Sequence, residues 1–314
     1  MDIDGILVVA KPGGMTSHDV VSCVRRTLGM RRVGHAGTLD PDATGVLLVL
    51  LGKATAAMQF MVGLPKAYRA EIVLGITTDT QDASGKVLRI AEDVAISRDR
   101  FFEVLESFRG EVSQVPPMVS AVHHEGQRLY ELARRGIEVE RKARRVWIYD
   151  LDVESWPDEP LTVGSRVVVR VVCSSGTYVR QLAADIGEEL GCGAHLGRLV
   201  RTGVGWFDLA SSHTLEEIAA CAGRGCLESL VVPVAEGLSH LPAVTVSSED
   251  ARKISHGMPV KVPDRDLACV SPDYEPGNLV RVHAISRGRE LLCVARVEKD
   301  DGCARLRPVR VFAG

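Results

Sequence analysis

The sequence lacks any apolar stretch long enough to cross a bilayer. Its longest apolar run covers residues 46–51, well short of the roughly 18 residues that a membrane helix needs. The first ten residues also lack the basic segment and the small-residue cleavage site of a signal peptide. We therefore expect a cytoplasmic protein that does not associate with a membrane.

The eight cysteines show no metal-binding or redox spacing. No two of them form a C-x-x-C pair, and Cys221 and Cys226, with four residues between them, have no second pair nearby. An H-E-x-x-H motif is also missing from the nine histidines. These absences predict reduced cysteines throughout and no metal site.

Two nucleotide-binding signatures are absent as well. No Gly-x-Gly-x-x-Gly follows a strand and opens a helix, and no Gly-x-x-x-x-Gly-Lys-[Ser/Thr] occurs. The sequence therefore has neither the dinucleotide fingerprint nor a P-loop.

What is present is an ordinary globular composition with local basic clusters. The chain has 314 residues, enough for one large domain or two smaller ones, and a net charge of −3. That charge argues mildly against a polyanionic partner, but nucleic-acid binding depends on where the charge lies. Basic residues gather at 25–32 and again at 128–145. Each cluster fits either a solvated surface or a nucleic-acid contact.

Separate helices and strands, without regular alternation, predict an α+β fold. We expect strands at residues 5–10, 46–51, 68–74, 146–153 and 167–172, and helices at 17–28, 53–62, 98–108, 178–190 and 214–220. Residues 34–45 are expected to form a polar loop. Residues 114–145 contain a Pro-Pro break, a short basic helix ending at Gly136 and a charged return.

The composition changes around residues 236–242. Short β-type runs follow at 243–246, 279–284, 291–297 and 309–312, with turn residues between them. We expect a main domain at residues 1–238 and a small β-rich domain at 239–314.

The densest polar cluster is the loop at residues 34–45, which contains His35, Asp40 and Asp42. The two aspartates could pair as acid and base, or one could act alone as a nucleophile with His35 as a positioning group. An Asx turn at Asp40 and a helix or strand cap at Asp42 explain the same residues without chemistry. Spacing alone does not choose between these interpretations.

A second cluster, residues 173–182, follows a strand and opens a helix. Its exposed N–H groups suit an anion, and Arg180, one turn into the helix, could pair with a carboxylate from elsewhere. Ordinary capping with Arg180 on the surface is an equally good interpretation. Tyr68, in an expected strand, could stack on a base or simply pack in the core.

Several motifs, taken in order, closely resemble those of the TruB-type tRNA pseudouridine synthases. The matching residues are Lys11-Pro12, Thr16-Ser17, 34–41, 43–45, Lys66-Ala67-Tyr68, 78–80, Asp82-Ala83, Gly85, 114–117, Ser120-Ala121, Gly126, Tyr130, Ala133-Arg134, Gly136, 176–180 and 190–196. Each motif is modest, but their order and spacing from residue 6 to about residue 240 make the resemblance very specific.

The resemblance implies a mixed, largely antiparallel central sheet with flanking helices, and an enzyme that isomerises uridine 55 in the tRNA T-loop without a cofactor. It places Asp40 on the catalytic aspartate, Arg180 on its arginine partner and Tyr68 on the aromatic residue that stacks on the flipped base. It also places Tyr178 and Leu199 in the pocket lining. Asp42 falls on a variable position and becomes a turn residue.

The remaining assignments also come from the resemblance. His35 falls on the residue that fills the RNA loop when the base leaves, and Lys11 and Pro12 are expected to support the pocket floor. Residues of about 113–145 match an insertion that closes over the T-loop, and residues 239–314 match a PUA-like RNA-binding domain. We expect tRNA as the partner and a monomer.

Three other functions are compatible with these residues. The chain could be an RNA-binding or RNA-folding module, or a synthase that acts on other RNAs with a guide-RNA complex, or a hydrolase that uses Asp40 and Asp42. The presence of Asp40, Tyr68 and Arg180 together argues against a binding-only protein. The absence of long lysine-rich tails argues against the guide-RNA enzyme.

Overall fold

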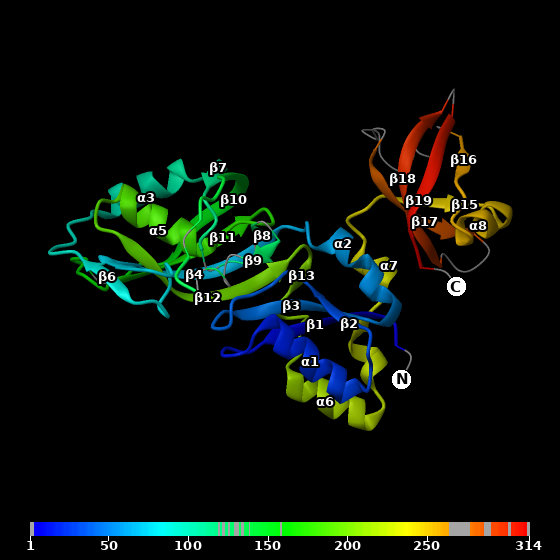
Figure 1. Ribbon diagram of the computed structural model, residues 1–314, viewed down its shortest axis with the longest axis horizontal. Coiled ribbons are helices and arrows are strands. Elements are labelled where there is room, and N and C mark those ends of the chain that lie inside the picture. Colours follow the sequence, from blue (N-terminus) through cyan, green and yellow to red (C-terminus); the bar gives the residue numbers. More distant parts are fainter. Residues whose placement is uncertain are drawn as a thin grey trace.

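The computed structural model of the chain is shown in Figure 1. It describes residues 3–118, 120, 123–124, 126–128, 132, 135–137, 139–157, 159–263, 277–285, 290–300 and 303–312. Ten residues of the insertion expected at about 113–145, among them most of the segment 129–134 where the basic helix was expected, therefore lie outside the described residues.

Ten strands form the larger sheet. They are β1 (Gly5–Lys11), β2 (Val33–Ala36), β3 (Thr44–Leu51), β4 (Lys66–Leu74), β7 (Gly110–Gln114), β10 (Arg144–Ser155), β11 (Arg166–Cys173), β12 (Ala194–Val204), β13 (Phe207–Asp208) and β14 (Val231–Val232). Their order is β14-β1-β3-β12-β4-β11-β10-β7, with β2 beside β3 and β13 beside β12. Within this described sheet the strand pairs are antiparallel except β3 with β12, which run parallel.

Helices cover the two halves of this sheet separately. Helices α1 (Ser17–Leu28) and α6 (Leu215–Arg224) lie side by side against β1 and β3, and α3 (Arg98–Ser107) and α5 (Val179–Glu189) lie against the other half (Figure 1). The shorter elements are η1 (Gly52–Ala57), α2 (Met58–Met61), η2 (Leu227–Leu230), α7 (Val234–Gly237), and the hairpins β5 (Ile76–Thr78) with β6 (Val87–Ile90) and β8 (His123–His124) with β9 (Gln127–Arg128). None of the helices in the described part of the chain has both the length and the apolar character needed to span a bilayer.

Strands β1 and β3 are buried on both faces, which explains their continuously apolar sequences. One face packs against Val20, Val24 and Leu28 of α1. The opposite face packs against the short helices α2 and α7 and against the C-terminal part of the chain.

The C-terminal part forms a second sheet of five strands. These are β15 (Ala243–Val246), β16 (Val260–Val262), β17 (Leu279–Ala284), β18 (Leu291–Asp300) and β19 (Cys303–Val311), in the order β15-β17-β18-β19-β16, with helix α8 (Ser248–Ser255) packed against them. The sheet has its own apolar core, while Leu291 and Val294 of β18 join the core beneath β1 and β3.

The predicted α+β class and mixed, largely antiparallel sheet are confirmed. The predicted loop at residues 34–45 is wrong at both ends, because residues 34–36 belong to β2 and residues 44–45 belong to β3. Gly34, His35 and Ala36 pair with Leu50, Val49 and Leu48 of β3. Pairing with β3 gives the backbone N–H and C=O groups of these residues their hydrogen-bond partners. The segment is therefore a strand although its own sequence, with the polar His35, does not predict one.

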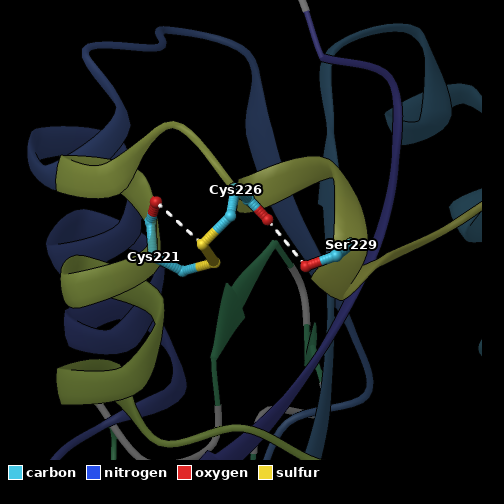
Figure 2. Close-up of a disulfide and its surroundings, with 3 residues drawn as sticks. All are labelled: Cys221, Cys226 and Ser229. Carbon is cyan, nitrogen blue, oxygen red and sulfur yellow. Dashed lines mark hydrogen bonds between the residues drawn. A yellow bond between two sulfur atoms is a disulfide. The ribbon is translucent and has the colours of Figure 1, made fainter.

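The prediction that all cysteines are reduced is wrong for one pair. Cys221 and Cys226 form a disulfide, with their Cα atoms 5.1 Å apart (Figure 2). Gly225 ends α6 with a φ of +73°, and the N–H of Cys226 donates to the carbonyl of Cys221 at 3.0 Å. This Schellman turn folds the chain back so that the two cysteines face each other. Five other cysteines are free, and Cys269 lies outside the described residues.

Candidate active site

A pocket of about 360 Å³ opens beside the loop that joins β2 to β3. Its wall is formed by residues 37–40 and 174–180 together with Val62, Lys66, Tyr68, Ser120, Leu199 and Arg201. Of the side chains predicted as site residues, the structure brings Asp40, Tyr68, Tyr178, Arg180 and Leu199 into one cavity.

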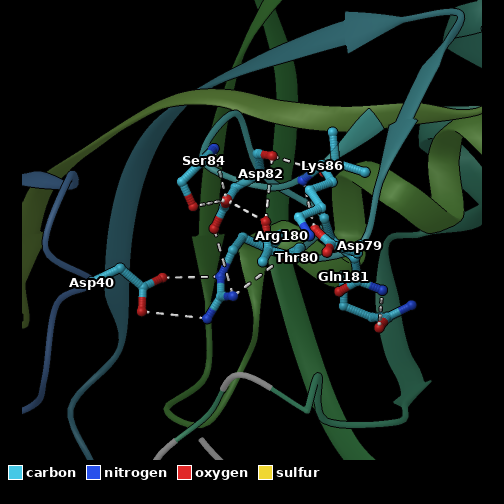
Figure 3. A network of polar contacts seen from close by, with 10 residues as sticks. Asp40, Asp79, Thr80, Asp82, Ser84, Lys86, Arg180 and Gln181 are labelled. Carbon is cyan, nitrogen blue, oxygen red and sulfur yellow. Dashed lines mark hydrogen bonds and ion pairs between the residues drawn. The ribbon is translucent and has the colours of Figure 1, made fainter. Parts of the chain in front are cut away.

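Asp40 and Arg180 form a two-point ion pair in this pocket (Figure 3). Arg180 Nε lies 3.0 Å from Asp40 Oδ2, and Arg180 Nη2 donates to Asp40 Oδ1 at 3.3 Å. Arg180 is only 5% exposed, whereas the Asp40 side chain is 44% exposed and faces the cavity. The guanidinium therefore fixes the orientation of a carboxylate that a bound molecule can still reach.

The surroundings of Asp40 act on its pKa in opposite directions. Burial raises the pKa of Asp40 above its ordinary value, Arg180 lowers it, and the nearby Asp82 carboxylate raises it, with a net rise. The removal of water is thus the dominant effect, and Arg180 offsets part of it. The result is a carboxylate more basic than one on the surface.

Asp82 is a site residue that the sequence reasoning did not identify. Its carboxylate lies 3.6 Å from Arg180 Nη1, and that same nitrogen donates to the Thr80 carbonyl at 3.3 Å. Thr80 Oγ1 and Ser84 Oγ donate to Asp82 Oδ1 at 2.7 and 2.6 Å, which fixes the Asp82 side chain (Figure 3). Asp82 belongs to one of the motifs that match the TruB-type synthases, at residues 78–85. Nothing in the spacing of that motif indicated a function for its carboxylate.

Tyr68 points from β4 into the pocket and is 8% exposed. Burial raises the pKa of the Tyr68 hydroxyl, and the Arg201 guanidinium offsets part of that rise. The hydroxyl therefore remains protonated at neutral pH and is available as a hydrogen-bond donor.

Tyr178 directly precedes α5 and has its backbone held by a side chain from β7. Its N–H donates to Gln114 Oε1 at 3.1 Å, and its carbonyl accepts from Gln114 Nε2 at 3.3 Å. Gln114 is buried, so these bonds are shielded from water. They link the start of α5, and with it Arg180, to the strand that leads into the insertion.

Lys11 lies behind the pocket wall and is 1% exposed. Its ammonium donates to the carbonyls of Pro12, Met15 and Pro41 at 2.8, 2.6 and 2.8 Å. Burial lowers the pKa of Lys11 to about 8. Because Pro41 follows Asp40, these three bonds tie the aspartate loop to the end of β1.

His35 is the predicted substrate-binding residue that the structure does not place in the pocket wall. It lies within β2, and its Nδ1 atom is buried with no hydrogen-bond partner among the described residues. Burial lowers the pKa of His35, so the ring is neutral at physiological pH.

Three further wall residues were not identified from the sequence. Lys66 and Arg201 are buried cations, and Ser120 has a buried hydroxyl with no hydrogen-bond partner among the described residues. Basic residues in strands are usually exposed, so their spacing carries no signal of burial. No group of three or more metal-binding side chains lies together in the described part of the chain.

Two family models match consecutive parts of the chain. The N-terminal domain of the TruB family pseudouridylate synthases matches residues 25–179, and the tRNA pseudouridylate synthase B C-terminal domain matches residues 180–239. Together they cover the pocket residues from Gly37 to Arg201. The fold and the pocket therefore define a protein of the pseudouridine synthase class.

Full-length relatives narrow this class to one family. The chain is 45% identical to a tRNA pseudouridine synthase B of Moorella thermoacetica over 98% of this chain and 99% of the relative. It is 49% identical to one of Symbiobacterium thermophilum over 82% and 83% of the two chains. The chain belongs to the TruB family.

A solved structure supports the same fold. A chain in the crystal structure of a Cbf5-Nop10-Gar1 complex superposes with a TM-score of 0.76 at 26% sequence identity. The match covers 98% of this chain and 84% of that chain. The similarity therefore extends over both sheets.

Proposed function

We propose that this protein converts uridine 55 in the T-loop of tRNA into pseudouridine. The observation that carries the proposal is the Asp40–Arg180 ion pair, in which the carboxylate faces a cavity that Tyr68 also lines. The relatives named as tRNA pseudouridine synthases support tRNA as the substrate class.

Asp40 acts on the sugar of a nucleotide flipped out of the RNA. The carboxylate either attacks C1′ or removes a proton from C2′ to give a glycal. In both routes the C1′–N1 bond breaks and uracil turns within the pocket. A new C1′–C5 bond then forms, as the Asp40–C1′ ester bond breaks in the first route or as C2′ takes back its proton in the second. The proton on C5 is released to solvent and N1 takes one up, so the reaction needs no oxidant or reductant.

The other pocket residues bind and orient the nucleotide. Arg180 favours the ionised form of Asp40, and Tyr68 stacks on the flipped base and assists proton transfer through its hydroxyl. Tyr178 and Leu199 enclose the base. His35 fills the space that the base leaves in the RNA, which offsets part of the few kcal/mol that flipping costs.

The rest of the chain binds the remainder of the tRNA. The insertion at about 113–145 closes over the T-loop, and the PUA-like domain at 239–314 contacts the RNA beyond it. Residues 1–238 form the catalytic domain, Lys11 and Pro12 support its pocket floor, and the protein acts as a monomer in the cytoplasm.

The test is release of tritium from a tRNA transcript labelled with [5-³H]uridine. We expect release by the wild type and by Asp42→Asn, which removes an exposed carboxylate from the same loop, and none by Asp40→Asn. Asp40→Asn should still bind tRNA. A U55→C transcript, which should release no tritium, tests the position.

Failure of the proposal would take a definite form. Tritium release by Asp40→Asn near the wild-type rate would remove Asp40 from the mechanism. No release by the wild type, with tRNA still bound, would favour an RNA-binding module. Undiminished release from the U55→C transcript would point to a synthase that acts at another position.

A further inference from the structure

Arg201 is a buried cation in the pocket whose charge no carboxylate of the described residues neutralises. It is 1% exposed, and its guanidinium donates to three backbone carbonyls, those of Val46, Thr38 and Gly37, at 2.7, 3.2 and 3.0 Å. Carbonyl dipoles satisfy the N–H groups but leave the net charge in place. Arg180, by contrast, is paired with two carboxylates.

The charge of Arg201 acts on the ionisable groups around it. Together with burial it lowers the pKa of Lys66 to about 8, and it offsets part of the burial-driven rise in the pKa of Tyr68. Among the described wall residues, Lys66, Arg180 and Arg201 are basic, and Asp40 is the acidic one. Basic side chains that are themselves buried therefore outnumber acidic ones in the wall, which favours negative charge inside the cavity.

Arg201 lies next to the residue that is assigned to contact the base. In the register of β12 and β4, Arg201 lies directly opposite Tyr68, the side chain assigned to stack on the base. Its contacts with the carbonyls of residues 37 and 38 also hold the chain just before Asp40.

The proposed reaction creates a negative charge on the base. When the C1′–N1 bond breaks, its electron pair leaves with N1, so the detached uracil is a monoanion. This holds for attack at C1′ and for the glycal route alike. A fixed, desolvated cation beside that anion lowers the barrier to cleavage, because it is already in place when the charge forms.

We propose that Arg201 is a catalytic residue that stabilises the uracil anion during detachment through its uncompensated guanidinium charge. This inference rests on the proposed function, because it requires a reaction that cleaves the glycosidic bond of uridine. It assigns the two pocket arginines separate tasks: Arg180 orients the Asp40 carboxylate, and Arg201 stabilises the leaving base.

The first experiment separates charge from position. Single-turnover rates at saturating enzyme are measured with [5-³H]uridine-labelled tRNA for Arg201→Gln, which can still donate to carbonyls but is neutral, and for Arg201→Lys, which keeps the charge. We expect a loss of about 10²- to 10³-fold in Arg201→Gln and of less than about 10-fold in Arg201→Lys. Arg198→Gln removes an exposed charge from the same strand and should keep the wild-type rate.

The second experiment tests whether Arg201→Gln is slow because the leaving uracil anion is less well stabilised. Fluorine at C5 withdraws electrons and makes the base anion intrinsically more stable, so a tRNA with 5-fluorouridine at the target should depend less on Arg201. We expect the loss in Arg201→Gln to shrink by about 10-fold or more on this substrate. Disappearance of 5-fluorouridine from nuclease digests, followed by mass spectrometry, gives the rate.

The outcomes distinguish this inference from the proposed function. A wild type that releases no tritium overturns both. An active wild type with equal losses on the two substrates in Arg201→Gln overturns the anion role alone and leaves a purely positioning residue. If Arg201→Gln does not fold, Arg201→Lys decides: a folded Arg201→Lys that loses more than about 10²-fold contradicts a role based on charge.

Discussion

The pocket and the outer part of the larger sheet use the same charged residue types in opposite ways. On β10, β11 and the turn before β7, an exposed ion-pair cluster joins Arg109 and Arg170 to Asp150 and Asp152, with N–O distances of 2.6 to 3.4 Å. These side chains are 28% to 53% exposed, so water screens them and each pair contributes about 0–1 kcal/mol. In the pocket, Arg180 and Arg201 are almost completely buried.

The two regions also differ in how far their contacts reach along the chain. Asp152 and Arg170 of the exposed cluster are 18 residues apart, whereas Asp40 and Arg180 are 140 residues apart. A local pair on adjacent strands forms wherever the sheet forms. A distant pair forms only in the complete fold. Tertiary structure therefore brings Asp40 and Arg180 together, and it also shields the guanidinium of Arg180 from water.

Because the pocket ion pair is buried and the outer cluster is exposed, we expect the largest loss of activity for Arg180→Met. Removal of this guanidinium takes away the cation that contacts both Asp40 and Asp82, which favours protonation of Asp40. We expect a loss of about 10³-fold or more in the single-turnover rate of tritium release, with tRNA affinity retained. A rate within a few-fold of the wild type, measured on folded protein, would show that the buried pair has no catalytic role.

Tyr68→Phe tests the second buried polar group of the pocket. Phenylalanine keeps the stacking surface but cannot donate a proton, so a step after binding should slow by about 10²-fold. Rapid-quench single-turnover kinetics with saturating enzyme measure this step. An unchanged rate would mean that Tyr68 contributes only packing.

The raised pKa of Asp40 predicts an early loss of activity on the acid side. The reaction needs the ionised carboxylate, and a raised pKa means that the carboxylate becomes protonated at a higher pH than a surface aspartate. Single-turnover rates as a function of pH should therefore fall at a pH above the ordinary aspartate value of about 3.9. Full activity down to that value in folded enzyme would contradict the dominance of burial.

Lys66→Met extends the comparison to stability. The pKa of Lys66 is about 8 in the folded protein and about 10.5 in a free lysine, so the unfolded chain binds more protons between these values. Stability contributed by this group therefore rises as the pH increases from about 8 to about 10.5. Urea unfolding at several pH values should show a weaker alkaline rise in Lys66→Met than in the wild type, and Lys86→Met, an exposed control, should match the wild type.

The smallest effect is expected for Arg170→Met, in the exposed cluster. Since both of its ion pairs are screened by water, the free energy of unfolding should fall by about 0–1 kcal/mol, and tritium release should not change. Urea denaturation and the tritium assay measure both quantities. A loss of activity comparable to that of Arg180→Met would erase the distinction between the two regions.

The sequence predicted the local elements better than the long-range contacts. The helix that begins at Ser17 and ends before Gly29, and the apolar strands at 5–10 and 46–51, are set by neighbouring residues, and the structure has them. The short strand at residues 33–36 was missed because it is stabilised by pairing with β3, not by its own polar sequence. The disulfide was missed because its geometry comes from the turn at Gly225.

The site residues show the same difference between local sequence signals and long-range contacts. Only the resemblance linked Asp40, Tyr68 and Arg180, because no spacing rule connects residues so far apart. Arg201 and Lys66 stayed hidden, since a basic residue in a strand gives no sign that it faces inward. Burial of a charge is a property of the assembled fold, and a single sequence does not report it.

The parallel pairing of β3 with β12 has a mechanical consequence. In the described part of the chain, the two halves of the larger sheet meet there through two paired positions, Val200 with Thr44 and Arg201 with Gly45. A side chain at position 45, where φ is +107°, would place its Cβ 2.1 Å from the Arg201 carbonyl oxygen, so the close approach requires glycine. The Asp40–Arg180 pair and the bonds from Arg201 to residues 37, 38 and 46 cross the same junction. The groups assigned to the chemistry therefore also hold the two halves together, so a ligand that took over these contacts would remove links between the halves.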